Sequence, residues 1–355
     1  MFGRLGPLFQ NDEHASLHFH PTLLSMTEII FSMILLILKS VLNGLMVLIG
    51  GTGSQGRPGS IKTEVPKLSV SMPFRLTKQD IEQYMIATGS SRDAIEKHKV
   101  IKALFLSAAT EPCMLLVMVK QGCPIQPLGS VNVRNSFEIL RPDLCSLDFL
   151  EEVEGGMVFS TLESPARIMK RGLEYDLSIE FRVPSKSDPN ILVPVFRQIH
   201  TLLQFTKIPA SAKLAEITRE PEFQFQLMGK PRAGQTAVGY SDPTKWARLC
   251  KDYNPIHISG IAAKLYGLPG KIAHGNHVAA LALKEILNAS EKESGAPLRL
   301  EVSFKRPVTV PGKLDILVEF KQKQDSSITH YAIARGEKVC VQGKFWEISG
   351  PIQKS

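Results

Sequence analysis

The chain has 355 residues, of which 43% are hydrophobic and 21% charged, and its formal net charge is +8. This composition is that of a folded protein with a sizeable core and two domains, and it excludes a disordered chain, a collagen-like fibre and a protein with many membrane spans. The positive charge favours an acidic partner, such as a phosphate-bearing ligand, an acidic carrier protein or a membrane surface. Nucleic acid is disfavoured as a partner, because the sequence has no block of Lys and Arg interleaved with aromatic residues.

The cysteine pattern favours a reducing compartment. The five cysteines are odd in number, widely spaced and without a C-x-x-C pair, so we expect neither a disulfide framework nor a zinc site. They are Cys113, Cys123, Cys145, Cys250 and Cys340.

An apolar stretch near the N-terminus, residues 29–50, is long enough to cross a bilayer as a helix. Lys39 and Asn43 lie near its middle, where both would raise the free energy of insertion. Arg57, Lys62 and Lys67 follow the stretch, which by the positive-inside rule leaves the rest of the protein in the cytosol. The sequence therefore predicts a membrane anchor. A membrane-surface helix, a packed helix and a misassigned start codon are the alternatives.

A glycine-rich run comes directly after this stretch. Residues 51–56 read Gly-Thr-Gly-Ser-Gln-Gly, the spacing of a dinucleotide-binding loop. Such a loop must open a helix, but Arg57-Pro58-Gly59 breaks a helix in its first turns. We predict a flexible linker, so that residues 1–65 form an N-terminal segment made of the apolar helix and this linker.

The remaining chain divides into two halves with the same order of elements, residues 66–215 and 216–355, with a proline-containing boundary at 209–231. In each half a helical region precedes strands with alternating apolar residues, which makes an α+β protein. We expect the two antiparallel sheets to join edge to edge, because each alone would leave an edge exposed. The first half has predicted helices at 76–88 and 95–109, the second of them ended by Glu111-Pro112, and predicted strands at 130–139, 173–183 and 192–205. The second half has a helical region at 242–285 and predicted strands at 298–306, 314–321, 329–334 and 339–346.

One segment of the second half carries residues suited to acid–base chemistry. Asp242-Pro243 reads as the start of a short helix that ends near Cys250. Asn254-Pro255 then signals a turn, which can fold His257 back toward Asp252. A carboxylate and an imidazole near one point can hold a water molecule and pass its proton.

A helix N-terminus follows downstream, where residues 268–276 lead into an apolar helix at 277–287. Gly275 lies at this N-terminus, so its backbone N–H and the positive end of the helix dipole are suited to stabilising an oxyanion. A metal cluster of His257, His274 and His277 is the alternative; we disfavour it because the helix adds no carboxylate ligand nearby. His274 is expected to be structural.

These motifs resemble the hydratase-2 motif of MaoC-like dehydratases, the (R)-specific enoyl-CoA hydratases. The resemblance rests on Asp252-x-Asn254-Pro255-x-His257 followed by Ala273-His274-Gly275, and on the strand and turn at 304–308 and 311–312. Residues 127–135 and 171–177 are similar to the degenerate N-terminal repeat of tandem members. The resemblance covers residues 104–346 and implies a double hotdog fold, in which two antiparallel sheets each wrap a central helix.

The resemblance also implies a function. Asp252 and His257 would share the base and acid work of adding water to the double bond of a trans-2-enoyl thioester, while the N–H of Gly275 stabilises the oxyanion. Asn254, Pro255 and His274 would support the loop. The implied enzyme needs no cofactor and no metal, because CoA or acyl carrier protein enters as part of the substrate. The candidate contacts for the phosphates of that carrier are Lys264, Lys271, Lys305 and Arg306.

Two residues depart from the family pattern. Lys251 stands where the family commonly has glycine, and Ser259 stands where it often has an acidic residue. The first half lacks the Asp-x-Asn-Pro-x-His motif, so the resemblance implies an internal pseudo-dimer with one active site per chain. Two other functions remain open: a non-catalytic protein that binds or assembles acyl thioesters on this fold, and a hotdog thioesterase.

Overall fold

The structure is a computed structural model that describes residues 3–48, 63–127, 130–215, 233–287, 295–323 and 326–348. The glycine-rich run at 51–56 and most of the predicted boundary at 209–231 lie outside these ranges. The predictions for those two segments therefore stay predictions.

The strands of both halves form one continuous sheet, in the order β1-β2-β4-β6-β7-β3-β9-β12-β11-β10-β8, with β5 paired to β6. Apart from the parallel pair β1 and β2, neighbouring strands are antiparallel. The N-terminal segment supplies β1 (His14–Ser16). The first half supplies β2 (Leu68–Pro73), β3 (Ser130–Ile139), β4 (Met157–Leu162), β5 (Arg167–Met169), β6 (Gly172–Pro184) and β7 (Leu192–Phe205). The second half supplies β8 (Gly234–Val238), β9 (Leu298–Phe304), β10 (Gly312–Lys323), β11 (Ser326–Arg335) and β12 (Lys338–Glu347).

The two halves meet at β3 and β9. These strands pair antiparallel, with Arg134 opposite Ser303 at one end and Ile139 opposite Leu298 at the other. The backbone groups of both strands are thus used in one ladder, and neither half leaves an open edge at the centre of the molecule.

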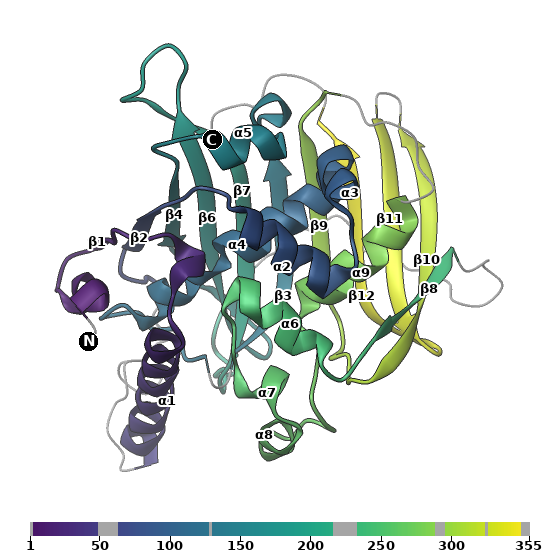
Figure 1. Ribbon diagram of the computed structural model, residues 1–355. Coiled ribbons are helices and arrows are strands. Elements are labelled where there is room, and N and C mark those ends of the chain that lie inside the picture. The colour runs from purple at the N-terminus through teal and green to yellow at the C-terminus, as the bar shows by residue number, and fades with distance from the viewer. Residues whose placement is uncertain are drawn as a thin grey trace.

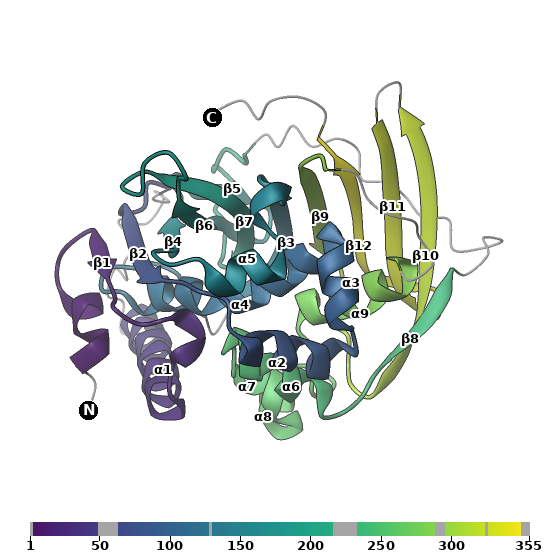
Figure 2. The ribbon, with the colours of Figure 1, turned by 45° about the horizontal axis from the view of Figure 1, so that its top comes forward.

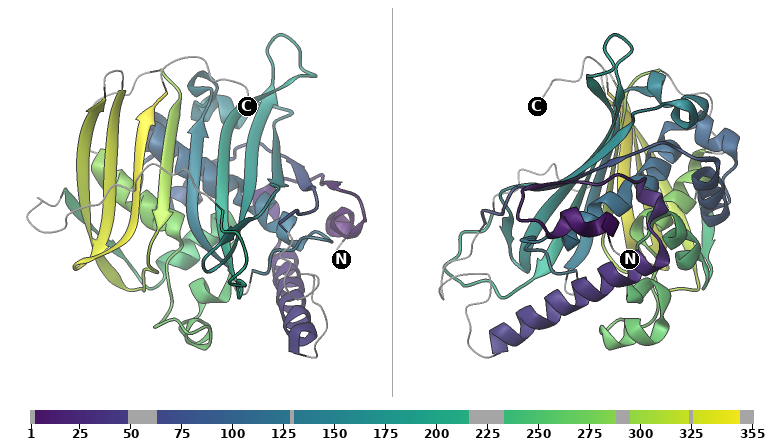
Figure 3. Two further views of the ribbon diagram at one scale, coloured as in Figure 1. Left: turned by 180° about the vertical axis from the view of Figure 1, so that it is seen from behind. Right: turned by 60° about the vertical axis from the view of Figure 1, so that its left-hand side comes forward.

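The helices cover one face of this sheet, and the view from behind in Figure 3 shows the strands in front of them. The central helices of the two halves, α4 and α9, lie next to each other beneath the sheet (Figures 1 and 2). The α-helices are α1 (Met26–Leu48), α2 (Lys78–Thr88), α3 (Arg92–Lys97), α4 (Lys99–Val119), α5 (Leu147–Glu152), α6 (Asp242–Cys250), α7 (Pro255–Ile258), α8 (Gly260–Leu265) and α9 (Gly275–Leu287). Short 3-10 helices lie at Gly3–Phe9, Pro21–Leu23 and Pro142–Leu144.

Helix α4 corrects one prediction. The sequence suggested that Glu111-Pro112 ends the helix, yet α4 continues through Pro112 to Val119. Helix α4 is long and apolar enough to cross a membrane, but 94% of its most apolar window is buried inside the protein. It is a core helix. Burial along its whole length outweighs the ~3 kcal/mol that an internal proline costs.

Helix α1 coincides with the predicted anchor helix, and one side of it packs on the protein. Ile29 and Leu36 are buried, and Lys39 donates from its Nζ to the carbonyl oxygen of Met118 on α4, 3.2 Å away. The charge that would oppose insertion into lipid therefore has a partner within the protein. The opposite side of α1 remains exposed.

All five cysteines are free and buried, which agrees with the predicted absence of a disulfide framework. Burial raises the pKa of the Cys145 thiol to about 12, so this thiol stays protonated at neutral pH.

Candidate active site

The site begins where α6 ends. Lys251 caps this helix with φ of 56°, in the left-handed region, and its N–H donates to the carbonyl oxygen of Ala247 over 2.8 Å. This conformation turns the chain so that Asp252 leaves the helix sideways. A residue with a Cβ pays ~1–2 kcal/mol for it, which gives a physical reason why glycine is common at this position in the resembling family.

A tight turn then brings the next functional side chain back. The N–H of Asn254 donates to Oδ1 of Asp252 at 3.1 Å, and the N–H of Ile256 donates to Oδ1 of Asn254 at 3.3 Å. Pro255 is the first residue of α7, where a missing N–H has no consequence. These bonds fix the loop so that His257, on α7, faces Asp252.

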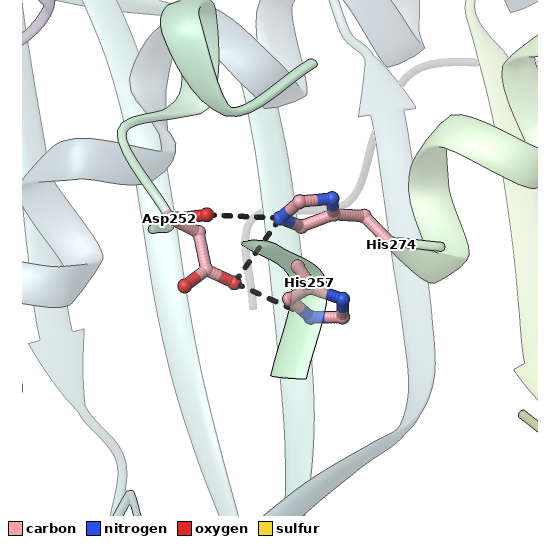
Figure 4. A group of neighbouring side chains, drawn as sticks. All are labelled: Asp252, His257 and His274. Carbon is pink, nitrogen blue, oxygen red and sulfur yellow. Dashed lines mark hydrogen bonds and ion pairs between the residues drawn. The ribbon is translucent and has the colours of Figure 1, made fainter. Parts of the chain in front are cut away.

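Asp252 and His257 form a close acid–base pair (Figure 4). Nε2 of His257 lies 3.9 Å from Oδ2 of Asp252, and Nδ1 lies 3.0 Å from the carbonyl oxygen of Ile272. That carbonyl can only accept, so Nδ1 carries the proton and Nε2 directs its lone pair toward Asp252. Burial lowers the pKa of His257, and the negative charge of Asp252 opposes the shift only in part. The imidazole is therefore neutral at pH 7.

His274 supports the pair from the side. Its ring stacks on that of His257 with centroids 3.8 Å apart, and its Nε2 lies 3.0 Å from the backbone oxygen of Asp252. Burial, reinforced by the neighbouring His257, lowers the pKa of His274 well below its ordinary value. The neutral ring thus donates its Nε2–H to the loop that carries Asp252.

Asp252, His257 and His274 also have one donor atom each within 4.8 Å of one another, the spacing of a small metal site. The hydrogen bond just described uses the Nε2 proton of His274, so this nitrogen has no lone pair to offer a metal ion. The donor set falls short of the three protein ligands that catalytic zinc takes. His277, the third histidine of the alternative raised by the sequence, lies elsewhere: its Nε2 donates to the carbonyl oxygen of Ala87, 2.9 Å away.

Gly275 is the first residue of α9 and lies against β9, the strand that joins the second half to the first. A Cβ built on Gly275 would lie 2.4 Å from Cε1 of Phe304 on β9, so only glycine lets the helix approach this closely. The amides of the first helical turn have no partner inside the helix. Together with the positive end of the helix dipole, these amides are suited to stabilising an oxyanion, and that role of Gly275 stays a prediction.

The first half contributes side chains that hold this helix N-terminus, which the sequence reasoning missed. Asn135 on β3 donates to Oδ1 of Asn276 at 2.7 Å, and Nδ2 of Asn276 donates to Oγ of Ser107 on α4 at 3.3 Å. All three residues are buried. Their contacts join residues up to 169 positions apart in the chain, so no local spacing could have revealed them.

Glu111, one helical turn after Ser107 on α4, is a second residue that the sequence reasoning missed. It is buried, and its Oε2 atom has no hydrogen-bond partner within the protein. Burial raises the pKa of this carboxyl well above its usual range, and the negative charge of Asp252 raises it further. Both effects favour the neutral carboxylic acid form of Glu111. The sequence showed Glu111 only as part of an expected helix end.

The candidate phosphate contacts differ in their exposure to solvent. Lys271 is buried, and its Nζ donates to the carbonyl oxygen of Tyr240 at 2.8 Å, so it would have to break this bond to reach a phosphate. Lys305 and Arg306 are exposed directly after Phe304, beside the N-terminus of α9. Lys264 is exposed on α8.

Comparison with known proteins matches this site to a family. Residues 226–339 match the family described as "MaoC like domain". The chain is 39% identical over 211 residues to 3-hydroxyacyl-thioester dehydratase X of Mycobacterium tuberculosis, which covers 59% of this chain and 67% of the relative. A shorter match, 38% identical over 66 residues, covers 18% of this chain and 3% of fatty acid synthase beta subunit pkiC of Emericella nidulans.

Solved structures show the same fold. The crystal structure of HtdX of Mycobacterium tuberculosis superposes with a TM-score of 0.56 at 18% identity, over 79% of this chain and 98% of that one. A MaoC-like dehydratase from Phytophthora capsici superposes with a TM-score of 0.50 at 16% identity, over 82% and 98% of the two chains. At these identities the likeness concerns the hotdog fold and not the substrate.

Proposed function

This chain belongs to the MaoC-like dehydratase family, and we propose that it catalyses the reversible hydration of trans-2-enoyl thioesters to (R)-3-hydroxyacyl thioesters in fatty-acyl metabolism. The class, a hydratase or dehydratase, follows from the family. The observation that supports the reaction best is the pair of Asp252 and His257, whose facing atoms are 3.9 Å apart.

This spacing suits one shared water molecule. It is too long for a direct hydrogen bond, whereas two bonds of about 2.8 Å from one water oxygen span such a distance. Nε2 of neutral His257 and the Asp252 carboxylate both accept hydrogen bonds, so the water oxygen is left free to attack C3 of the enoyl group.

The proton balance closes within the pair. As the water oxygen bonds to C3, one member of the pair takes a water proton, and the electrons of the double bond move toward the thioester oxygen. The N–H of Gly275 and the dipole of α9 stabilise the negative charge that develops there. The proton is then delivered to C2, so the pair regains its starting state. Dehydration is the same path in reverse.

CoA and acyl carrier protein are both proposed as carriers of the acyl group. Exposed Lys305 and Arg306, beside the N-terminus of α9, are the proposed contacts for the carrier's phosphates, and Arg306 would exchange its bond to the carbonyl oxygen of Val339 for one to a phosphate. No separate cofactor is required. The two hotdog units act as an internal pseudo-dimer in which the first unit holds the oxyanion helix through Asn135 and Ser107. We also propose that the protein is attached to a membrane through α1, with its catalytic part in the cytosol.

An assay of enoyl-CoA substrates tests this function. The full-length protein is mixed with trans-2-enoyl-CoA esters of increasing chain length, and the loss of absorbance of the conjugated thioester is followed. A free-thiol reagent in parallel detects thioester cleavage. We expect absorbance loss without thiol release. Thiol release would identify a thioesterase, and binding without either change would identify a non-catalytic acyl-thioester protein.

A further inference from the structure

Helix α1 presents a continuous apolar stripe to solvent. Five exposed side chains recur every fourth residue along one side of the helix, and Val41 lies beside them. The five are Met26, Ile30, Ile34, Leu38 and Leu42. The opposite side of the helix is held on the body by Ile29 and Leu36 and by the bond from Lys39 to Met118. The stripe is thus fixed in orientation, as a helix lying in a membrane surface requires.

Helix α8 exposes a second apolar group close to the active site. Ile261 and Leu265, one turn apart, are 76% and 83% exposed, and Tyr266 is 46% exposed. Such exposure is unusual for three large apolar side chains in six residues. The helix begins at Gly260, three residues after His257, and packs against α7.

The C-terminal end of α1 and helix α8 reach the same edge of the molecule. Figures 1 and 3, which share one vertical axis, show the C-terminal end of α1 and the α7–α8 segment reaching the lower edge of the protein in all three views. The hairpin between β6 and β7 lies at the opposite, upper edge. A flat boundary can therefore touch α1 and α8 together.

The scarcity of acidic residues near both helices in the sequence favours a lipid bilayer over a basic protein surface as the partner. No Asp or Glu occurs between Glu28 and Glu64, or between Asp252 and Glu285. Among the cations of these stretches that the structure describes, Lys264 on α8 is exposed, whereas Lys39, Lys271 and Lys284 each donate to a backbone carbonyl oxygen. Apart from Glu28, the exposed apolar side chains of both helices have no acidic residue nearby in the sequence, and exposed Lys264 lies among those of α8. This combination suits the interface of a membrane that contains anionic lipids.

We propose that α1 and α8 form one lipid-binding surface, which seats the active site at the membrane and lets long-chain enoyl thioesters reach Asp252 and His257 from the bilayer. This inference rests on the proposed hydration of acyl thioesters and adds the source of the substrate. A long acyl chain partitions into the membrane and leaves its thioester at the interface, where α8 adjoins the catalytic loop.

A dye on α8 tests the contact directly. The five native cysteines are buried, so Ile261→Cys in the full-length chain provides a selectively reactive thiol for an environment-sensitive nitrobenzoxadiazole dye. Ile191→Cys, in the β6–β7 hairpin and 57% exposed, is the matched control. Vesicles of phosphatidylcholine and phosphatidylglycerol should brighten and blue-shift the dye at position 261 and leave the dye at position 191 unchanged. An unchanged signal at 261 while the protein is bound to vesicles, or the absence of vesicle binding, would overturn the proposal. Brightening at 261 without vesicles as protein concentration rises would show a second copy as the occupant and overturn it too.

Kinetics separate this inference from the proposed function. The variant Ile261→Ser/Leu265→Ser should hydrate soluble crotonyl-CoA at the wild-type rate, since neither side chain is buried. Its kcat/KM for a long-chain enoyl-CoA presented in vesicles should fall at least tenfold, whereas Ile191→Ser should change neither value. Equal kcat/KM of the wild type and the double variant on vesicle-borne substrate would refute the membrane route. Failure of the wild-type protein to hydrate crotonyl-CoA would refute the proposed function itself.

Discussion

Replacing Gly275 by alanine should slow catalysis, because the new Cβ would clash with the ring of Phe304. A smaller side chain at position 304 should relieve this clash. The new Cβ would lie 2.4, 2.6 and 2.8 Å from three carbons of the Phe304 ring. Normal carbon contacts begin near 3.4 Å, so the N-terminus of α9 or the ring must move by about 1 Å. Overpacking of this kind costs ~1–3 kcal/mol of folding free energy, and a displacement of ~1 Å in a positioning group can cost ~100-fold in rate.

The assay combines hydration rate and stability. We expect Gly275→Ala to lower kcat by ~10–100-fold and the free energy of unfolding by ~1–3 kcal/mol. Gly270→Ala, in the same loop, is the control, because no atom lies within 4 Å of the Cβ it would add. This variant should resemble the wild type in both measurements.

A second substitution, at Phe304, completes a double-mutant cycle with Gly275→Ala. Phe304→Leu removes the ring atoms that the new Cβ would meet, so Gly275→Ala/Phe304→Leu should recover at least half of the lost activation free energy. The two substitutions should therefore couple favourably in both rate and stability. A Gly275→Ala variant with the wild-type rate would refute the reasoning. So would a double variant that regains stability and remains as slow as Gly275→Ala, since the amide position would then not explain the rate.

Three further predictions concern the charges of the site. Because burial lowers the pKa of His257, the fall of kcat/KM toward acid pH should be centred below 6.5, the ordinary value of an exposed imidazole. A decline centred at or above 6.5 would contradict the burial of this ring. Because burial and Asp252 raise the pKa of Glu111 well above its usual range, its protonated form is favoured, and Glu111→Gln should keep stability within about 1 kcal/mol at pH 7 in a urea titration. Loss of folding would indicate that the charged form is needed. Because Lys251 has a positive φ, Lys251→Gly should raise the free energy of unfolding by ~0.5–1 kcal/mol in the same titration. A lower free energy of unfolding would mean that the attraction between Lys251 and Asp80 outweighs the backbone strain.

Elements built from local pattern could be predicted from the sequence. The alternation at 130–139 and 192–205 gave strands with the same bounds as β3 and β7. The turn at Asn254-Pro255 and the helix after Gly275 are local as well, and the structure places them as expected.

The features that the sequence did not predict depend on contacts with other parts of the fold rather than on a local sequence pattern. The short strand β8 has no clear alternation of apolar and polar residues, and it is a strand because β10 pairs with it. Helix α4 passes through Pro112 because its surroundings bury it. Glu111 and Asn135 approach the site from the first half, and only the paired sheets bring them there.

The most direct test of the account is the hydration rate of trans-2-decenoyl-CoA by Asp252→Asn and His257→Gln. Each variant should lose at least ~100-fold in kcat while its unfolding curve stays that of a folded protein, because a general acid–base group contributes ~100–10,000-fold. His18→Gln, an exposed histidine far from the site in sequence, should keep the wild-type rate. Wild-type turnover in a folded Asp252→Asn or His257→Gln variant would contradict the assignment of this pair as the active site.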